Sequence, residues 1–171
     1  MEPDAAGSCP FDPPRLLARL AELGVDARTF DHEAVLTVAQ AKAATAHVPG
    51  LHCKNLFLEE RGGSCWLVVL PADKALELRG LADALGTRRL SFASPSKLRE
   101  RLGVGPGFVS PFAVVNDPGG TVRVVLDRDL LLGEALKFHP LDSSRTTVVA
   151  PGGLLRFLEA SSHAPRLVDL P

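Results

Sequence analysis

The hydrophobic positions of this chain alternate between a helical and an extended period. Four leucines recur at helical spacing between Leu16 and Leu23, directly after Asp12-Pro13-Pro14, and Gly24 follows them. An N-cap residue, prolines in the first turn and a closing glycine are typical of one helix. The same signals predict four more helices, over Thr37–Val48, Ala75–Leu85, Ser94–Leu102 and Pro151–Ala160.

Short apolar runs between turn residues predict strands. Two hairpins are expected, Lys54–Glu60 with Cys65–Leu70 and Phe112–Asn116 with Thr121–Leu126, each joined by a glycine-rich turn. Single strands are expected at 25–32, 89–93 and 146–149, while 130–138 fits a strand or a helical turn and the tail at 165–171 has no element. Hairpins interleaved with single helices favour an α+β fold, with a mixed, mostly antiparallel sheet flanked by helices.

Length and composition fit one globular domain. The 171 residues are expected to form a flexible N-terminal arm, 1–12, and a single folded domain, 13–171. The formal net charge of −1 argues against nonspecific coating of nucleic acid, so no DNA partner is expected. We expect no membrane partner and a cytoplasmic location, because no apolar run approaches the ~20 residues of a membrane span, and the three cysteines form no disulfide-like pattern.

Lys54 lies at the start of the apolar strand segment Leu56-Phe57-Leu58. A lysine there either extends its amine to solvent from a strand edge or binds an anionic ligand. The neighbouring Cys53 is either a thiol activated by that cation or a small apolar filler. No metal site is expected, because His52 and Cys53 are adjacent and point to opposite faces of a strand.

Three further features each have two interpretations. The loop GVGPGF, residues 103–108, is either a connector or a source of backbone N–H donors for a close ligand. His139, held out of the helical region by Pro140, either packs at the surface or orients a substrate. The last feature is a cluster of five basic residues, which either contacts phosphates or forms a solvated face. Its members are Arg88, Arg89, Lys97, Arg99 and Arg101.

Taken together, these segments resemble a known family. The chain carries, in order, HCKNLFLEE, WLVVLPADKALEL, RRLSFASPSKLRERLGVGPGFVSPFAVVND, FHPLDSSRTT and LLRFLEA. Over residues 15–170 this order and spacing resemble the YbaK/ProX family of aminoacyl-tRNA editing proteins. The KNLFL strand after Gly-Leu-His is most similar to its freestanding prolyl-tRNA editing branch. The resemblance implies a single editing domain that deacylates mischarged tRNA(Pro), with alanyl-tRNA(Pro) as the expected substrate.

The resemblance also implies the site. Lys54 occupies the position of the family's essential lysine, and Asn55 beside it is expected to bind the ribose or the carbonyl. Backbone N–H groups between Gly107 and Ser110 would stabilise the oxyanion, with water as the nucleophile. Residues expected to line the aminoacyl pocket are Gly105, Val109, Pro111, His139 and Ser143. No cofactor and no metal is implied. The expected partners are the tRNA(Pro) acceptor end and a prolyl-tRNA synthetase.

Three positions depart from the family pattern. Cys53 stands where threonine is common, Ala113 where glycine is often seen, and Ser143 where the His-Pro turn usually carries asparagine. The last two bear on the amino acid specificity. Two alternatives therefore stay open: a deacylase for cysteine, serine or threonine esters, and a module that binds the tRNA acceptor end without hydrolysis.

Overall fold

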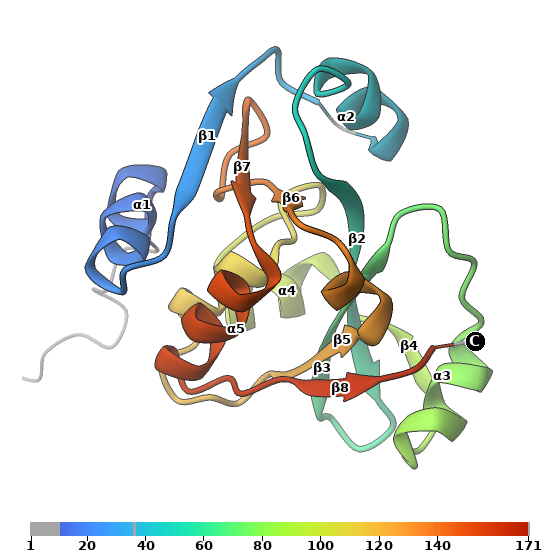
Figure 1. The fold of residues 1–171 in the computed structure, drawn as a ribbon. Helices are drawn as coiled ribbons and strands as arrows, with labels where there is room; N and C mark the ends of the chain where they lie inside the picture. Colours follow the sequence, from blue (N-terminus) through green and yellow to red (C-terminus); the bar gives the residue numbers. More distant parts are fainter. Residues whose placement is uncertain (1–10, 36, 171) are drawn as a thin grey trace, which may run out of the picture.

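A mixed sheet of eight strands runs through the protein (Figure 1). The structure, a computed structural model, describes residues 11–35 and 37–170, so residues 1–10 of the expected arm lie outside the described residues. The strands are β1 Ala27–Asp31, β2 Leu51–Glu60, β3 Cys65–Pro71, β4 Leu90–Phe92, β5 Arg123–Asp127, β6 Leu136–Phe138, β7 Arg145–Val149 and β8 Arg166–Val168. The α-helices are α1 Pro13–Glu22, α2 Val38–Ala44, α3 Leu78–Leu85, α4 Pro95–Leu102 and α5 Pro151–Ala160, with 3₁₀ helices η1 Pro111–Asn116 and η2 Arg128–Leu132.

The strand β2 organises the sheet. The strand order is β1-β7-β6-β2-β3-β5-β8, and β4 also pairs with β2. Strand β3 takes one edge of β2, over residues 53–59. On the other edge β6 pairs at 51–52 and β4 pairs at 58–60. Between these two partners, this edge of β2 has a gap without a strand partner, and Lys54 and Asn55 lie in the gap.

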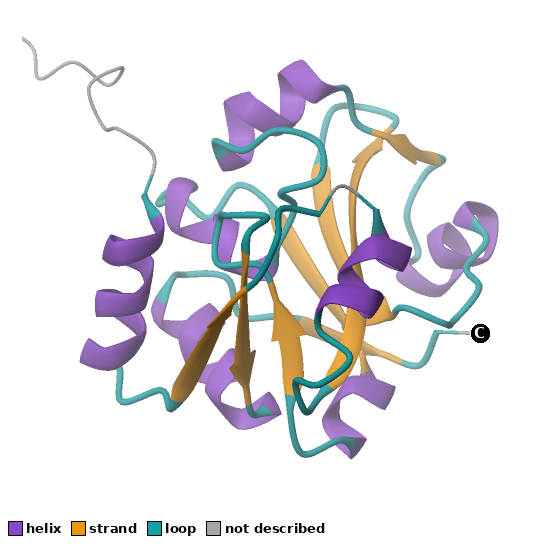
Figure 2. Cartoon of the chain, turned by 90° about the horizontal axis from the view of Figure 1, so that it is seen from above, coloured by secondary structure: helices purple, strands orange, loops and turns teal. Residues whose placement is uncertain are grey.

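Two apolar clusters cover the two faces of the sheet, and helices lie on both sides (Figure 2). The larger cluster joins α1, α4, η1 and α5 to the sheet, and Phe112 packs edge-on against both Phe138 and Phe157. The smaller cluster joins α3 to the other face through Leu81 and Leu85. With both faces covered, the central strand β3 is buried from Cys65 to Leu70, as the continuous apolar run in its sequence requires.

The expected fold class and the first hairpin are confirmed, but the second hairpin is wrong. Residues 111–116 form the 3₁₀ helix η1, capped by the Ser110 hydroxyl, which accepts from the Phe112 N–H at 3.2 Å. Pro111 begins this turn, and three consecutive buried side chains follow, Phe112 to Val114, so the segment lacks the alternation of a hairpin strand. Strand β5 instead pairs parallel with β3 and with β8.

Smaller differences concern element ends. The second helix stops at Ala44, four residues before Val48, and the ambiguous segment 130–138 divides into the end of η2 and the strand β6. The tail was expected to carry no element, yet β8 forms there and pairs with β5. Long-range pairing of this kind leaves no local signal, because a three-residue strand has too few positions to show a period.

Two ionic clusters fasten loops to the sheet. Asp127 is fully buried and accepts from Lys74 Nζ at 2.6 Å, and Lys74 also pairs with Asp129 at 3.0 Å. At the other site, His163 Nε2 lies 2.8 Å from Asp117 Oδ2, and His163 Nδ1 lies 2.6 Å from the Ser161 carbonyl. Both nitrogens of His163 face acceptors, so the ring connects the Asp117 carboxylate with the Ser161 carbonyl.

Replacing Lys74 with methionine should lower the free energy of unfolding by about 2 kcal/mol. The buried Asp127 carboxylate would lose its cation and keep only the Asp129 N–H as a donor, at 3.1 Å. Urea unfolding measures the change. Arg128→Ala is the matched control, because Arg128 is exposed and its ion pair with Asp169 lies on the surface, so we expect a loss below about 0.5 kcal/mol. Equal stabilities of Lys74→Met and wild type would contradict the expectation.

Candidate active site

A cavity of about 290 Å³ lies at the gap in the sheet. Four parts of the chain meet there: the α2 region, strand β2, the glycine loop, and strands β6 and β7 with the turn between them. The lining residues are Val35, Thr37, Ala41, His52, Cys53, Lys54, Asn55, Leu56, Gly107, Val109, Lys137, Phe138, His139 and Thr146. Because the edge of β2 away from β3 has no strand partner at Lys54 and Asn55, the backbone on this edge is free to face a ligand.

Lys54 brings an unpaired cation to the cavity. Within the described ranges its amine forms no hydrogen bond and no ion pair, and the side chain is half-buried. The pKa of the neighbouring Asp73 carboxyl is lowered chiefly by its hydrogen bond and ion pair with Lys42, with a smaller effect from Lys54. Lys54 therefore retains its donors for an anion or a carbonyl oxygen.

Asn55 brings an unpaired acceptor to the same cavity. Its Oδ1 is buried and has no hydrogen-bond partner among the residues that the structure describes. An orphaned buried polar atom is costly, and native proteins keep one chiefly where a ligand or water completes it. Lys54 and Asn55 are successive strand residues with side chains on opposite faces, and both residues line this cavity.

The glycine loop contributes backbone donors. The N–H groups of Gly107 and Val109 have no acceptor in the described part of the chain, and both residues line the cavity. Gly107 has φ +86°, a left-handed conformation that favours glycine, and a Cβ there would meet no described atom within 4 Å. Two free amides beside a cation form a place where a developing oxyanion is stabilised.

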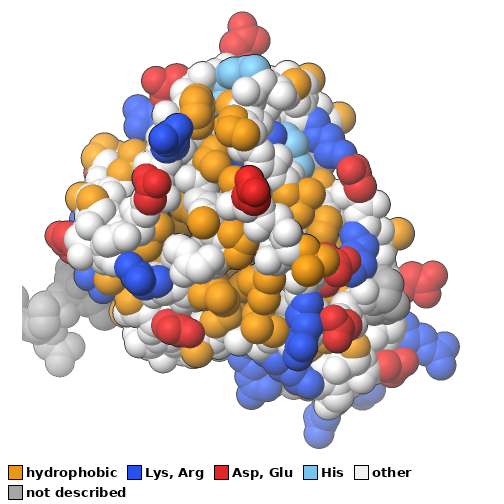
Figure 3. All heavy atoms as spheres, viewed as in Figure 1, with side chains coloured by type: hydrophobic (Ala, Val, Ile, Leu, Met, Phe, Trp, Pro, Cys, Tyr) orange, Lys and Arg blue, Asp and Glu red, His pale blue; other side chains and the backbone are white. Residues whose placement is uncertain are grey.

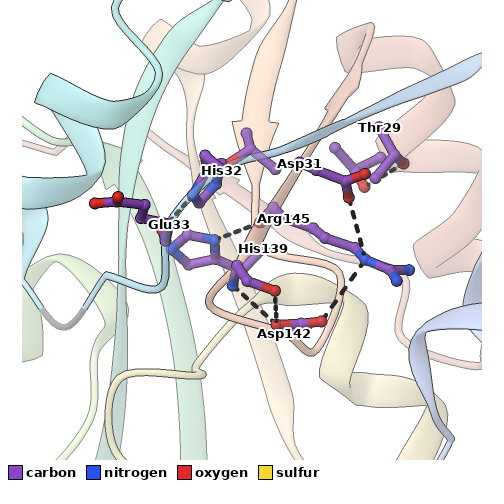
Figure 4. Close-up of polar contacts among 10 residues, drawn as sticks. Thr29, Asp31, His32, Glu33, His139, Asp142 and Arg145 are labelled. Atoms are coloured by element: carbon purple, nitrogen blue, oxygen red, sulfur yellow. Dashed lines mark hydrogen bonds and ion pairs between the residues drawn. The ribbon is translucent and has the colours of Figure 1, made fainter.

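His139 is held in one tautomer at the edge of the cavity (Figure 4). Its Nδ1 lies 2.8 Å from the Arg145 carbonyl, which can only accept, so Nδ1 carries the proton. Burial lowers the pKa of His139, an effect that the Arg145 carbonyl partly opposes. The ring is therefore neutral at pH 7, and its Nε2 is an acceptor.

Thr146 and His32 form a second polar contact beside His139. The Thr146 hydroxyl lies 2.8 Å from His32 Nε2, and His32 Nδ1 lies 2.7 Å from the Glu33 carbonyl (Figure 4). A hydroxyl next to an imidazole is the geometry of an activated nucleophile. Thr146 is only 3% exposed, however, so this contact fixes the β7 wall and does not present a nucleophile to a large ester.

His52 is the third histidine of the region. Thr45 donates its hydroxyl hydrogen to the Ala41 carbonyl at 2.6 Å, so the His52 Nε2 at 2.8 Å must be a donor to the same hydroxyl. Burial, followed by the charge of Lys137, lowers the pKa of His52 to about 4. His52 is thus neutral at pH 7 and joins the strand to α2. Among the described residues no cluster of His, Cys, Asp or Glu is arranged to hold a metal ion.

Cys53 should be nearly inert to alkylation at pH 8. Burial raises the pKa of its thiol to about 12, despite the nearby Lys137, so roughly 1,000-fold less thiolate is present than at an unburied cysteine. Peptide mass spectrometry after timed iodoacetamide treatment measures the rate at this residue. The urea-unfolded protein is the control and should react fully. Comparable rates for folded and unfolded protein would restore Cys53 as a candidate nucleophile.

Comparisons with known proteins agree with this geometry. A family model described as "Aminoacyl-tRNA editing domain" matches residues 32–157. The prolyl-tRNA editing protein ProX of Acetoanaerobium sticklandii is 32% identical, covering 91% of this chain and 95% of that protein. A prolyl-tRNA synthetase associated domain-containing protein 1 of Danio rerio is 34% identical, covering 88% of this chain and 83% of that protein.

This chain belongs to the aminoacyl-tRNA editing domain family. The family and the enzyme class expected from the sequence are thereby confirmed. The fold agrees as well: the crystal structure of a candidate trans-editing enzyme for prolyl tRNA synthetase superposes with a TM-score of 0.72 at 23% identity, covering 92% of this chain and 95% of that one.

The editing-domain cavity includes some of the expected site residues and omits others. Lys54, Asn55, Gly107, Val109 and His139 line it. The other four expected residues are not among its lining: Gly105, Ser110, Pro111 and Ser143.

The omitted residues support the cavity from behind. Ser110 and Pro111 are buried, because they begin the η1 turn. Ser143 is 7% exposed, and its carbonyl accepts from the Val35 N–H at 3.2 Å. Gly105 belongs to the glycine loop, and an added Cβ there would meet the Arg99 guanidinium at 3.7 Å. None of these four residues is among the cavity lining, and their contact with the substrate stays a prediction.

The five basic residues lie outside the editing cavity. Arg88, Arg89 and Arg99 are exposed, while Lys97 pairs with Glu59 at 3.6 Å. Arg101 is half-buried against Glu100 and Thr121. On the face seen in Figure 3, Lys and Arg side chains gather at the lower right. Their contact with tRNA stays a prediction.

Several residues that line the cavity of this editing domain were not expected from the sequence. Among them are Lys137, Thr146 and His52, whose ring is fixed in one tautomer as a donor to Thr45. Thr146 lies inside the FHPLDSSRTT segment and was within reach of motif reasoning. Lys137 carries no local signal, because an isolated lysine between Leu136 and Phe138 reads as an ordinary strand residue.

No helix in the ranges 11–35 and 37–170 has the length and apolarity to cross a membrane.

Proposed function

We propose that this protein hydrolyses the ester of mischarged tRNA(Pro), with alanyl-tRNA(Pro) as its main substrate. The observation that carries the proposal is the cavity itself. It places the unpaired Lys54 cation, the orphaned Asn55 oxygen and the free amides of Gly107 and Val109 around one space of about 290 Å³. Membership of the editing family and the prolyl-tRNA editing relatives support the substrate class.

The polar groups divide into those that bind the tRNA end and those that act on the ester. Lys54 meets the terminal phosphate or ribose of the acceptor end, as a point charge with three donors. Asn55 Oδ1 accepts from a ribose hydroxyl or from the ammonium of the aminoacyl group. Both contacts complete groups that have no partner among the described residues, so substrate binding offsets the cost of keeping them unpaired.

Hydrolysis adds a water oxygen to the aminoacyl carbonyl carbon and breaks that carbon's bond to the ribose oxygen. Negative charge grows on the carbonyl oxygen, and the Gly107 and Val109 amides are placed to stabilise it. The products are the free amino acid, tRNA with its ribose hydroxyl restored, and a proton. A ribose hydroxyl of the substrate assists the water, since Thr146 and Cys53 are unsuited to attack.

Selection against proline follows from the cavity walls. A proline synthetase cannot strongly reject alanine, because a difference of one or two methylenes is worth only about 1–3 kcal/mol. A second pocket that admits only the smaller side chain removes the error. Here His139, Thr146, Ala41 and Val35 all line the cavity and limit the width that a side chain can occupy.

A serine or threonine ester is the second candidate substrate. Thr37, His52 and His139 give the cavity polar groups that a hydroxyl side chain can bind. One relative of Escherichia coli (strain K12), a multifunctional Ser/Thr-tRNA deacylase ProXp-y, is 32% identical over 58% of this chain. Cysteinyl esters remain the third candidate, since their side chain is close in size.

The deciding experiment is a deacylation assay with purified protein. Alanyl-, prolyl-, cysteinyl-, seryl- and threonyl-tRNA(Pro) are compared at equal concentration. Selective loss of the alanyl ester supports the proposal, and selective loss of another ester keeps the reaction and changes the substrate. Binding of tRNA without hydrolysis of any ester would leave a non-catalytic binding module. Repeating the assay with added prolyl-tRNA synthetase tests whether that enzyme is a partner.

A further inference from the structure

The helix α2 forms one wall of the cavity but contributes little to the core. Thr37 and Ala41 line the cavity from this element. The described side chains from Ala39 to Ala44 are exposed or half-buried. An isolated helix of seven residues is unstable in water, so contacts with the rest of the fold must hold α2 in place.

A buried lysine of strand β6, Lys137, holds the chain just after the C-terminal end of α2. Lys137 is 6% exposed, and its Nζ donates to the Thr45 carbonyl at 3.2 Å and to the Val48 carbonyl at 3.0 Å. These carbonyls follow the last turn of α2, where the helix presents unpaired acceptors and a partial negative charge. A cation there is favourable and supplies charge-assisted hydrogen bonds.

The neighbouring residues are built around this contact. The His52 ring, two positions before Lys54, donates to the Thr45 hydroxyl at 2.8 Å. Gly50 has φ +127°, and a Cβ there would come within 3.0 Å of Lys137 Cγ and 3.3 Å of the Ala135 carbonyl. The glycine therefore leaves the space through which the lysine stem passes. At the surface, Lys42 pairs with Asp73 and gives α2 a solvent-screened attachment.

We propose that Lys137 is a specificity-determining positioning residue: by binding the carbonyls of Thr45 and Val48 it holds the α2 wall at the distance that excludes amino acids larger than alanine. The inference rests on the proposed function. Lys137 binds the carbonyls of Thr45 and Val48 just beyond α2. Thr37 and Ala41 line the cavity and are the wall residues that would contact the substrate. Losing the amine leaves the Val48 carbonyl without a donor among the described residues and the Thr45 carbonyl with only the Val48 N–H, at 2.9 Å, which lets the wall move outward.

The test uses Lys137→Met in the full chain, because methionine keeps the length of the stem and removes the donors. Hydrogen exchange of the amides between Ala41 and Val48 should become about tenfold faster or more, the effect expected when charge-assisted hydrogen bonds are lost. The ratio of alanyl- to prolyl-tRNA(Pro) hydrolysis should fall by about tenfold. Lys137→Arg keeps a cationic donor and should restore part of both effects. If Lys137→Met does not fold, Lys137→Gln replaces it as the milder variant.

His163→Gln is the matched control. It also removes a buried side chain that bonds distant parts of the chain, at a site that shares no residue with the cavity. It should lower stability without changing the ratio of the two esters or the local exchange of α2. Unchanged α2 exchange in Lys137→Met would overturn the inference, as would equal loss of both ester activities, which marks a merely structural residue. A wild type that hydrolyses no ester would overturn the proposed function, and the exchange measurement would still decide whether Lys137 holds the wall.

Discussion

Lys54→Ala should lower kcat/KM for alanyl-tRNA(Pro) by about 100- to 1,000-fold, the loss typical of removing one donor that acts on the transition state. Lys54 is the cavity lysine whose amine has no hydrogen bond or ion pair among the described residues, so its donors are reserved for the substrate. Single-turnover deacylation measures the loss. Circular dichroism should show an unchanged fold, because no described contact depends on the amine.

Two controls separate the role of Lys54 from a general effect of charge. Arg128→Ala removes one positive charge from η2, which lies outside the cavity, and should change kcat/KM by less than about twofold. Lys54→Arg keeps the charge but alters the donor geometry, and we expect it to recover only part of the activity. A kcat/KM of Lys54→Ala within tenfold of the wild-type value would contradict the role assigned to this lysine.

Asp117→Ala should lower the free energy of unfolding by about 3–5 kcal/mol, because the buried His163 ring would lose its hydrogen-bond partner. Asp117 also accepts from the Thr121 hydroxyl at 2.7 Å and from the Val122 N–H at 2.8 Å, so three donors lose their acceptor together. Urea unfolding at pH 7 measures the change. The exposed Asp169→Ala is the control, with an expected loss below about 1 kcal/mol.

The same carboxylate predicts an acid dependence of stability. Burial by itself would raise the pKa of Asp117, but hydrogen bonds from His163, Thr121 and Val122 outweigh it and lower that pKa below its unfolded value of about 4. A depressed folded pKa means that the contribution is complete above the unfolded pKa and disappears as the pH falls through the folded pKa. The stability difference between wild type and Asp117→Ala should therefore be constant from pH 7 to about pH 5 and shrink below pH 4. A difference that grows on acidification would falsify this assignment.

Local sequence signals determined much of the architecture. The Asp12, Thr37 and Ser94 caps each accept from a backbone N–H three residues on, and Gly86 and Gly103 end α3 and α4 in left-handed conformations. The β2–β3 hairpin formed as expected, because its two strands are close in sequence and their turn residues are specific. Motif order alone also identified the editing family and brought Lys54, Asn55 and His139 forward as candidates.

Tertiary structure decided the rest, because the deciding contacts join residues far apart in the chain. The parallel pairing of β5 with β3 and β8 replaced the second expected hairpin, and no local pattern distinguishes a parallel partner from an antiparallel one. The gap on the edge of β2 exists only because β6 and β4 occupy its two ends. Lys137 became part of the site for the same reason: its amine reaches carbonyls that lie 89 and 92 residues earlier in the chain. The sequence by itself thus determined which chemistry is available, and the nonlocal pairing of strands determined which of these side chains share one cavity.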